Sequence, residues 1–62
     1  MTFAEQLKSE RQRLGLSQAE LSRVLEVSFE AISKWEREVT TPAEITQEGA
    51  LARLRAIPTP KK

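Results

Sequence analysis

The chain has 62 residues, enough for one small domain, and its ten basic and nine acidic residues leave a formal net charge of +1. It contains neither cysteine nor histidine, which excludes disulfides, thiolate metal sites and the usual general base near neutral pH. This composition argues against an enzyme and supports a nucleic-acid binder only weakly, so the order of the residues has to decide the function.

The chain carries no pattern for membrane insertion or export. No apolar run approaches the roughly 20 residues that span a bilayer. The N-terminus lacks a basic segment followed by an apolar one, so we expect no signal peptide. The absence of cysteine fits a reducing compartment. We therefore expect a cytoplasmic protein without a membrane partner.

The first predicted helix covers about residues 3–14. Thr2 and Glu5 have the spacing of a capping box, in which each side chain binds the backbone N–H of the other residue. Gly15 has the position of a glycine that ends a helix in the left-handed conformation. Apolar residues at helical spacing form one stripe. They are Phe3, Leu7 and Leu14.

Two shorter helices are predicted next, over about residues 18–25 and 29–37. Ser17 and Glu20 form a second capping box in front of the first of them. Ser28 is a favourable N-cap for the other. The few residues between them must form a tight turn, so this stretch has the pattern of a helix-turn-helix.

The helix predicted over residues 29–37 has two distinct sides. At about 100° per residue from Ile32, the buried side includes Ala31, Trp35 and the cap Ser28. Phe29 lies at the border between the two sides. The polar side contains Glu30, Ser33, Lys34 and Arg37. Glu36 lies only about 40° from Ile32, and a carboxylate placed there needs a charged or hydrogen-bonding partner.

The last third of the chain is predicted to contain a short turn at residues 42–45 and a helix at about residues 46–57. Thr41 and Glu44 give a third capping signal. Ile45 does not share a face with the later leucines, and Gly49 weakens a helix, so we expect a break between turn and helix. We expect a domain over residues 1–57 and a flexible tail over residues 58–62.

These elements predict an all-α fold, a compact bundle of four to five short helices with a central helix-turn-helix. Its expected core has eight members. They are Leu7, Leu21, Leu25, Val27, Ile32, Trp35, Leu51 and Leu54.

Three segments of the chain match a known pattern together. They read LGLSQAEL at residues 14–21, VS at 27–28 and AISKWER at 31–37. With Pro42, they resemble the helix-turn-helix of the phage repressor and Cro family, often called XRE-type. The resemblance covers about residues 3–57 and is closest up to Arg37.

The resemblance implies a small helical domain that binds double-stranded operator DNA, usually as a homodimer. The helix that begins after Ser28 would be the recognition helix. The positions that match base-reading residues are Ser28, Phe29, Glu30, Ser33 and Lys34. Gln18 matches a residue that touches a phosphate and helps to hold the recognition helix.

The resemblance also implies an ion pair between Arg11 and Glu36, which would supply the partner that Glu36 needs. One residue departs from the family pattern, because Glu26 occupies a turn position that is usually glycine. Glycine tolerates positive φ without a Cβ clash, so Glu26 predicts either a strained turn or a variant geometry.

The chemistry of these side chains suits the major groove, which shows a distinct pattern for each base pair. Lys34 can donate to guanine, Glu30 can accept from cytosine N4, and Phe29 can contact a thymine methyl group; either serine can donate or accept. Cations and amides outside this set would contact phosphates, which position the protein without reading sequence. They are Gln18, Arg11, Arg37 and Lys8.

Each of these assignments has a structural alternative. Lys34 and Arg37 are also explained as solvated surface charges, and Glu30 as inert surface or as a group that repels the wrong DNA. Phe29 is equally compatible with the edge of the core. Arg11 is mainly structural on this interpretation, with a phosphate as a second possible partner.

Sequence and resemblance together predict a DNA-binding transcriptional regulator from a bacterial cell or a phage-infected host, most simply a repressor of a pseudo-palindromic operator. The alternative is a protein-binding adaptor or antitoxin-like module that keeps the same fold, which the near-neutral charge favours. We expect no catalytic residues, no metal, no cofactor and no small-molecule substrate.

Overall fold

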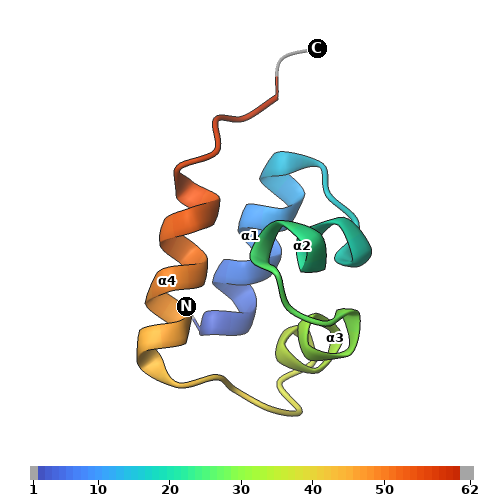
Figure 1. Ribbon diagram of the computed structural model, residues 1–62, viewed down its shortest axis with the longest axis vertical. Helices are drawn as coiled ribbons and strands as arrows, with labels where there is room; N and C mark the ends of the chain where they lie inside the picture. The colour runs from blue at the N-terminus through green and yellow to red at the C-terminus, as the bar shows by residue number, and fades with distance from the viewer. Residues whose placement is uncertain (1, 61–62) are drawn as a thin grey trace.

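Four α-helices form the secondary structure of the computed structural model, which describes residues 2–60 (Figure 1). They are α1 (Phe3–Leu14), α2 (Gln18–Leu25), α3 (Phe29–Glu36) and α4 (Glu44–Arg55). No described residue belongs to a strand. The expected all-α bundle is therefore confirmed, and the first three helices have the predicted bounds to within one residue.

Capping boxes start the first two helices as predicted. The Thr2 hydroxyl accepts from the Glu5 backbone N–H at 3.2 Å, and the Glu5 carboxylate accepts from the Thr2 N–H at 3.0 Å. Ser17 and Glu20 repeat this exchange at 3.1 and 2.9 Å. Each box satisfies two donors that the first turn of a helix leaves without a partner.

Left-handed residues end α1 and α2. Gly15 has a φ of 68° and Glu26 a φ of 57°, so both occupy the αL region. Glu26 thus adopts the conformation for which glycine is favoured, which agrees with the strained turn and not with a variant geometry. A side chain with a Cβ in this region costs roughly 1–2 kcal/mol.

The core lies where the four helices meet. Its buried members are Phe3, Leu7, Leu14, Leu21, Leu25, Ile32, Leu51 and Leu54. Four of the residues expected to be buried are not: Val27, Ala31 and Trp35 are half-buried, and Ser28 is exposed. The Trp35 ring packs edge-on against Phe3 at a centroid distance of 5.9 Å, so it covers the rim of the core.

The expected break in the last third of the chain is wrong, because α4 is one continuous helix. It begins at Glu44, and Ile45 in its first turn is 80% exposed. Leu51 and Leu54 are the buried residues that join α4 to the core, and the half-buried Ala50 packs against it, so Ile45 has no need to share their face. The glycine within α4, Gly49, costs about 1 kcal/mol relative to alanine, and packing against α1 outweighs it.

The expected cap of α4 is also wrong. Its N-cap is Ala43, which makes no side-chain capping bond, and Thr41 lies outside the helix. The Gln47 side chain instead donates to the Pro42 carbonyl at 2.8 Å. Tertiary packing therefore holds the start of α4 without the local signal that opens the other helices.

The described end of the tail, residues 58–60, follows α4 without helical structure. Arg13 contacts it, donating to the Thr59 hydroxyl and to the Leu54 carbonyl, both at 2.9 Å. Lys61 and Lys62, also part of the predicted tail, lie outside the described residues. The predicted domain boundary stays a prediction.

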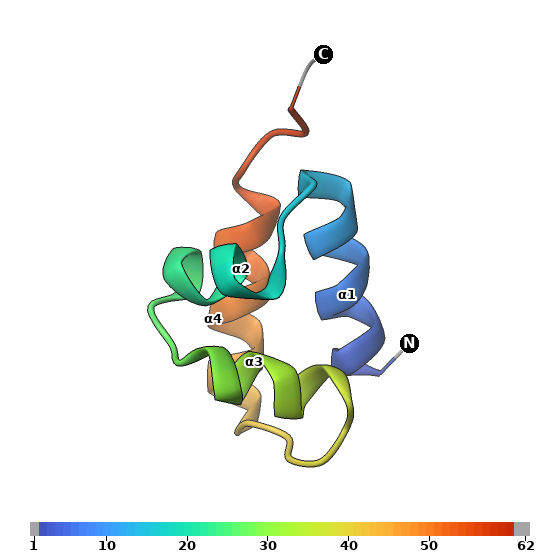
Figure 2. The ribbon, with the colours of Figure 1, turned by 90° about the vertical axis from the view of Figure 1, so that its right-hand side faces the viewer.

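The packing of the helices leaves α3 on the outside of the bundle. α2 packs on α3, and α1 packs on both α3 and α4. Figure 2 shows α3 below α2, with α4 behind these two helices and α1 to their right. One side of α3 is thus covered, and the other is free for a partner.

Candidate nucleic-acid interface

The free side of α3 carries the five residues predicted to read bases. Ser28 is the N-cap, and its hydroxyl accepts from the Ala31 N–H at 3.1 Å. Phe29 is 53% exposed, so the border position turned toward solvent. Glu30 is exposed, whereas Ser33 and Lys34 are half-buried. All five come from one short segment, but their contact with bases stays a prediction.

Glu30 and Lys34 form an ion pair along α3. The Lys34 Nζ lies 2.8 Å from a Glu30 carboxylate oxygen, at the i, i+4 spacing. The hydrogen bond and the charge of Lys34 lower the pKa of Glu30. In the free protein, Lys34 as donor and Glu30 as acceptor thus satisfy each other on the surface that would meet the major groove of DNA.

A hollow of about 410 Å³ lies beside this ion pair. Its lining residues are Ser28, Glu30, Ala31, Lys34, Trp35 and Thr40. Thr40 was not among the predicted site residues, because it belongs to the loop after α3 and only the fold returns that loop to the helix. The sequence signal for Thr40 as a site residue was weak, because it consists of one hydroxyl group within a β-branched run.

The ion pair between Arg11 and Glu36 is present and holds α3 against α1. Arg11 Nε and Nη2 donate to the two Glu36 oxygens at 2.8 and 3.1 Å, and Arg11 Nη1 donates to the Leu16 carbonyl at 3.1 Å. Gln18 adds a donor from α2 to the same carboxylate at 3.1 Å. Glu36 is only 3% exposed, so three helices share one nearly buried acceptor.

The predicted phosphate contacts are in two different situations. Lys8 and Arg37 are exposed, and Arg37 Nε also donates to the Ser33 carbonyl at 3.3 Å. Gln18 and Arg11 point inward to Glu36 through the atoms described above. Their role in holding α3 is part of the structure, whereas contact with phosphate stays a prediction for all four residues.

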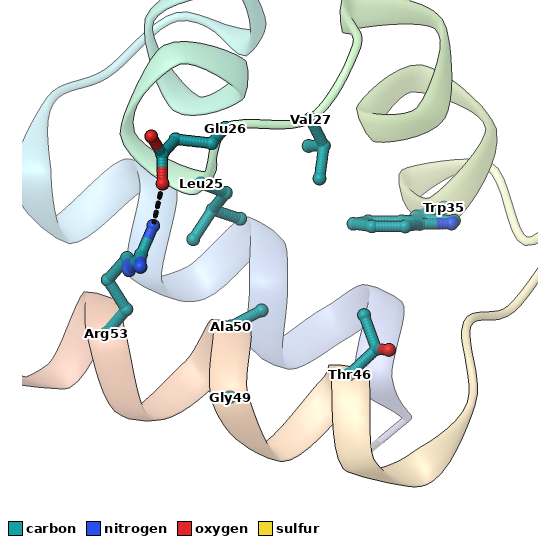
Figure 3. A pocket seen from close by; sticks show the side chains of 8 residues that line it. All are labelled: Leu25, Glu26, Val27, Trp35, Thr46, Gly49, Ala50 and Arg53. Atoms are coloured by element: carbon teal, nitrogen blue, oxygen red, sulfur yellow. Dashed lines mark hydrogen bonds and ion pairs between the residues drawn. The ribbon is translucent and has the colours of Figure 1, made fainter.

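The turn between α2 and α3 is attached to α4 by Arg53. Its Nη1 donates to the Glu26 carboxylate at 3.2 Å (Figure 3). The same Nη1 donates to the Val24 carbonyl at 3.3 Å. Figure 3 also shows that Trp35 and Val27 face α4 across an open groove. Sequence reasoning missed Arg53, because nothing local shows that residues 27 positions apart meet.

Two other kinds of site are absent from the described residues. Within residues 2–60, no cluster of three or more possible ligands is suited to hold a metal ion. Among the described helices, none is both long and apolar enough to cross a bilayer.

Comparison with known proteins agrees with this geometry. A family model described as helix-turn-helix matches residues 7–46, which include α2, α3 and most of α1. No curated protein and no solved structure matches the chain. The matched segment contains the Arg11, Gln18 and Glu36 network and the whole exposed face of α3.

Proposed function

Since the chain belongs to the XRE-type helix-turn-helix family of DNA-binding regulators, we propose that it represses transcription by binding a pseudo-palindromic operator as a homodimer. In such proteins the recognition helix enters the major groove while the preceding helix crosses the backbone. Two copies would place their recognition helices about 34 Å apart, in successive major grooves. The site of action would be the cytoplasm of a bacterial or phage-infected cell.

The observation that carries this proposal is the free side of α3, which presents donors, acceptors and one apolar ring on a rigid support. Lys34 would donate to guanine and Glu30 would accept from cytosine, while Phe29 would contact a thymine methyl group. Ser28 and Ser33 would donate or accept. The shared carboxylate of Glu36 supports this arrangement, because it fixes α3 relative to α1 and α2.

Phosphate contacts would set the register of the protein on the duplex. We assign them to Gln18 at the start of α2, to the exposed cations Lys8 and Arg37, and to Arg11 through Nη1, which donates to the Leu16 carbonyl and not to Glu36. Contacts of this kind carry no sequence information but account for most of the salt dependence.

Selection of random DNA by the purified protein, followed by footprinting of the recovered sequence at low salt, tests the proposal. We expect one enriched site with two related halves about one helical turn apart. Enrichment of no sequence, together with no footprint at low salt, would show that the protein is not a sequence-specific DNA binder.

Phe29 favours a second candidate function, a protein-binding adaptor or antitoxin-like module. An aromatic ring that is 53% exposed at the head of α3 is a suitable anchor for a protein partner. Salt separates the two candidates, since log K for DNA falls with log salt by about 0.9 per phosphate neutralised. A protein partner bound with no such slope favours the adaptor.

A further inference from the structure

α4 carries apolar residues on two opposite sides. At about 100° per residue, Leu51 and Leu54 face the core, and Ile45 lies roughly opposite. Ile45 is 80% exposed, well above the 53% of Phe29. A surface helix normally has one apolar stripe, so the second side of α4 is apolar surface without a partner among residues 2–60. This outward face consists of Ile45, Gly49, Ala52 and Ala56.

Charges of opposite sign lie along one edge of the outward face. Glu48 and Arg55 are seven residues apart, so they point in nearly the same direction and are separated by about 10 Å along the axis. That distance is too long for them to pair with each other. With Glu44 and Ala52 of α4 and Gln6 of α1, they line a hollow of about 390 Å³. The edge is thus acidic toward the start of α4 and basic toward its end.

We propose that the outward face of α4 binds the same face of a second copy, with the two helices antiparallel. A twofold axis then places Ile45 of each copy over Ala56 of the other, and Gly49 over Ala52. Nothing lies within 4 Å of where a Gly49 Cβ would be, so the two backbones can approach closely. The charged edges complement each other, because Glu48 of each copy faces Arg55 of the other.

This inference deepens the proposed function and rests on it for the homodimer that binds the operator. α4 has 12 residues, a length of about 18 Å, so one pair of such helices buries less than the roughly 1,200 Å² of a standard interface. We therefore expect a weak dimer, with a Kd of roughly tens of micromolar. Binding to both half-sites of one operator would stabilise it further.

Sedimentation equilibrium from about 5 to 500 μM protein tests the interface directly. Ile45→Glu is expected to raise the dimer Kd by roughly tenfold or more, because it places a charge in the apolar contact with Ala56 at both ends of the helix pair. Val39→Glu is the matched control, since Val39 is also an exposed apolar residue, 59% exposed, but lies outside α4. A monomer at every concentration, or equal effects of the two substitutions, would overturn the inference.

A charge exchange then tests the orientation of the helices. Glu48→Arg or Arg55→Glu alone is expected to raise the Kd by about three- to tenfold, because each creates two like-charge contacts across the twofold axis. The double variant restores both contacts with reversed polarity and should return to within about threefold of wild type. Additive losses in the double variant would exclude the antiparallel arrangement. Thermal unfolding of each variant shows whether a loss reflects misfolding.

The outcomes separate this inference from the proposed function. Dimerisation that depends on Ile45, without enrichment of any DNA sequence, would leave the interface standing and remove the operator-binding role. Binding to a site with two halves, with Ile45→Glu and both charge variants dimerising as wild type, would keep the role and overturn the interface.

Discussion

At the scale of single residues, Glu36 and Glu30 show how burial divides the work of two carboxylates on one helix. Glu36 is 3% exposed and bound by Arg11 and Gln18, so its charge is committed to holding helices together. Glu30 is exposed, and its ion pair is with Lys34 on the same helix. A base could therefore replace Lys34 as the partner of Glu30. The structural role of Glu36 and the proposed recognition role of Glu30 thus lie within two turns of α3.

Removal of the buried carboxylate should destabilise the fold. Glu36→Ala leaves the Arg11 guanidinium without its charged partner, and breaking a buried pair in this way costs about 3–5 kcal/mol. Thermal and urea unfolding measure the loss, with Glu48→Ala on the surface of α4 as the control. An Arg11→Met, Glu36→Leu double variant should recover much of it; unchanged unfolding of Glu36→Ala would contradict the role assigned to the pair.

Lys34 is predicted to read a base. Lys34→Ala should weaken operator binding by about 1–3 kcal/mol and relax specificity at one base pair, because the lost donor contacts one guanine. Lys8→Ala is the control, with an expected loss that is similar on every sequence and a smaller salt slope. Affinity measured on the operator and on single-base variants distinguishes the two. A uniform loss for Lys34→Ala would make it a phosphate contact.

At the scale of elements, the first two helices start from local signals and the fourth does not. Capping boxes open α1 and α2, whereas α4 begins at Ala43 without a side-chain cap. The turn between α2 and α3 is the strained joint, because Glu26 has positive φ and is held by Arg53. Local sequence and tertiary support therefore contribute in different proportion to each helix.

The capping glutamates should make stability depend on pH in acid. Hydrogen bonds to Thr2 and Ser17 lower the pKa of Glu5 and Glu20 below their ordinary value of 4.5. Groups with a lowered folded pKa contribute stability above that value and lose it as the pH falls through the folded pKa. Below pH 5, Glu5→Gln and Glu20→Gln should make the free energy of unfolding depend less on pH, while Glu48→Gln should not. The same pH dependence in all three variants would exclude the caps as the cause.

The strained turn predicts a stabilising substitution. Glu26→Gly removes a Cβ from the left-handed region, which should raise stability by about 0.5–1 kcal/mol despite the loss of the exposed Arg53 ion pair. Thermal unfolding measures the change. Arg53→Ala isolates the ion pair and should change stability by less than about 1 kcal/mol. A lower melting temperature for Glu26→Gly would mean that the contact with Arg53 matters more than the strain.

At the scale of the whole molecule, the bundle has a small core and therefore a small stability margin. Trp35 connects α3 to this core, since its ring touches Phe3 and lines the groove beside α4. Loss of this ring should affect the entire domain, because every helix packs around the same few buried side chains.

Trp35→Ala should lower the free energy of unfolding by about 3 kcal/mol, the low end of the range for a buried tryptophan, because the ring is only half-buried. Urea unfolding followed by far-ultraviolet circular dichroism measures the loss. Trp35→Phe, which keeps an aromatic contact with Phe3, should lose much less. Equal losses for the two variants would show that the edge contact contributes little.

The first three helices and the polar side of α3 were predictable because their signals are local. Capping residues, helix-ending glycine and apolar spacing act within a few residues of each other, so the chain itself encodes α1, α2 and α3. The resemblance added the partner of Glu36. The sequence did not decide whether Phe29 is exposed or buried, since the burial of a residue at the border depends on which neighbours the fold supplies.

Contacts between distant segments were decided only by the tertiary structure. Thr40 beside Lys34, Arg53 on Glu26 and the continuous α4 all depend on how helices pack, and no local pattern encodes that. Ile45 illustrates the limit: its phase correctly separated it from the leucines, but only the packed bundle showed that the helix continues and leaves Ile45 in solvent. The sequence by itself determined where helices form around caps and apolar stripes, because those interactions are short in range. The packed structure decided which faces stay free to bind, because burial is a property of the whole fold.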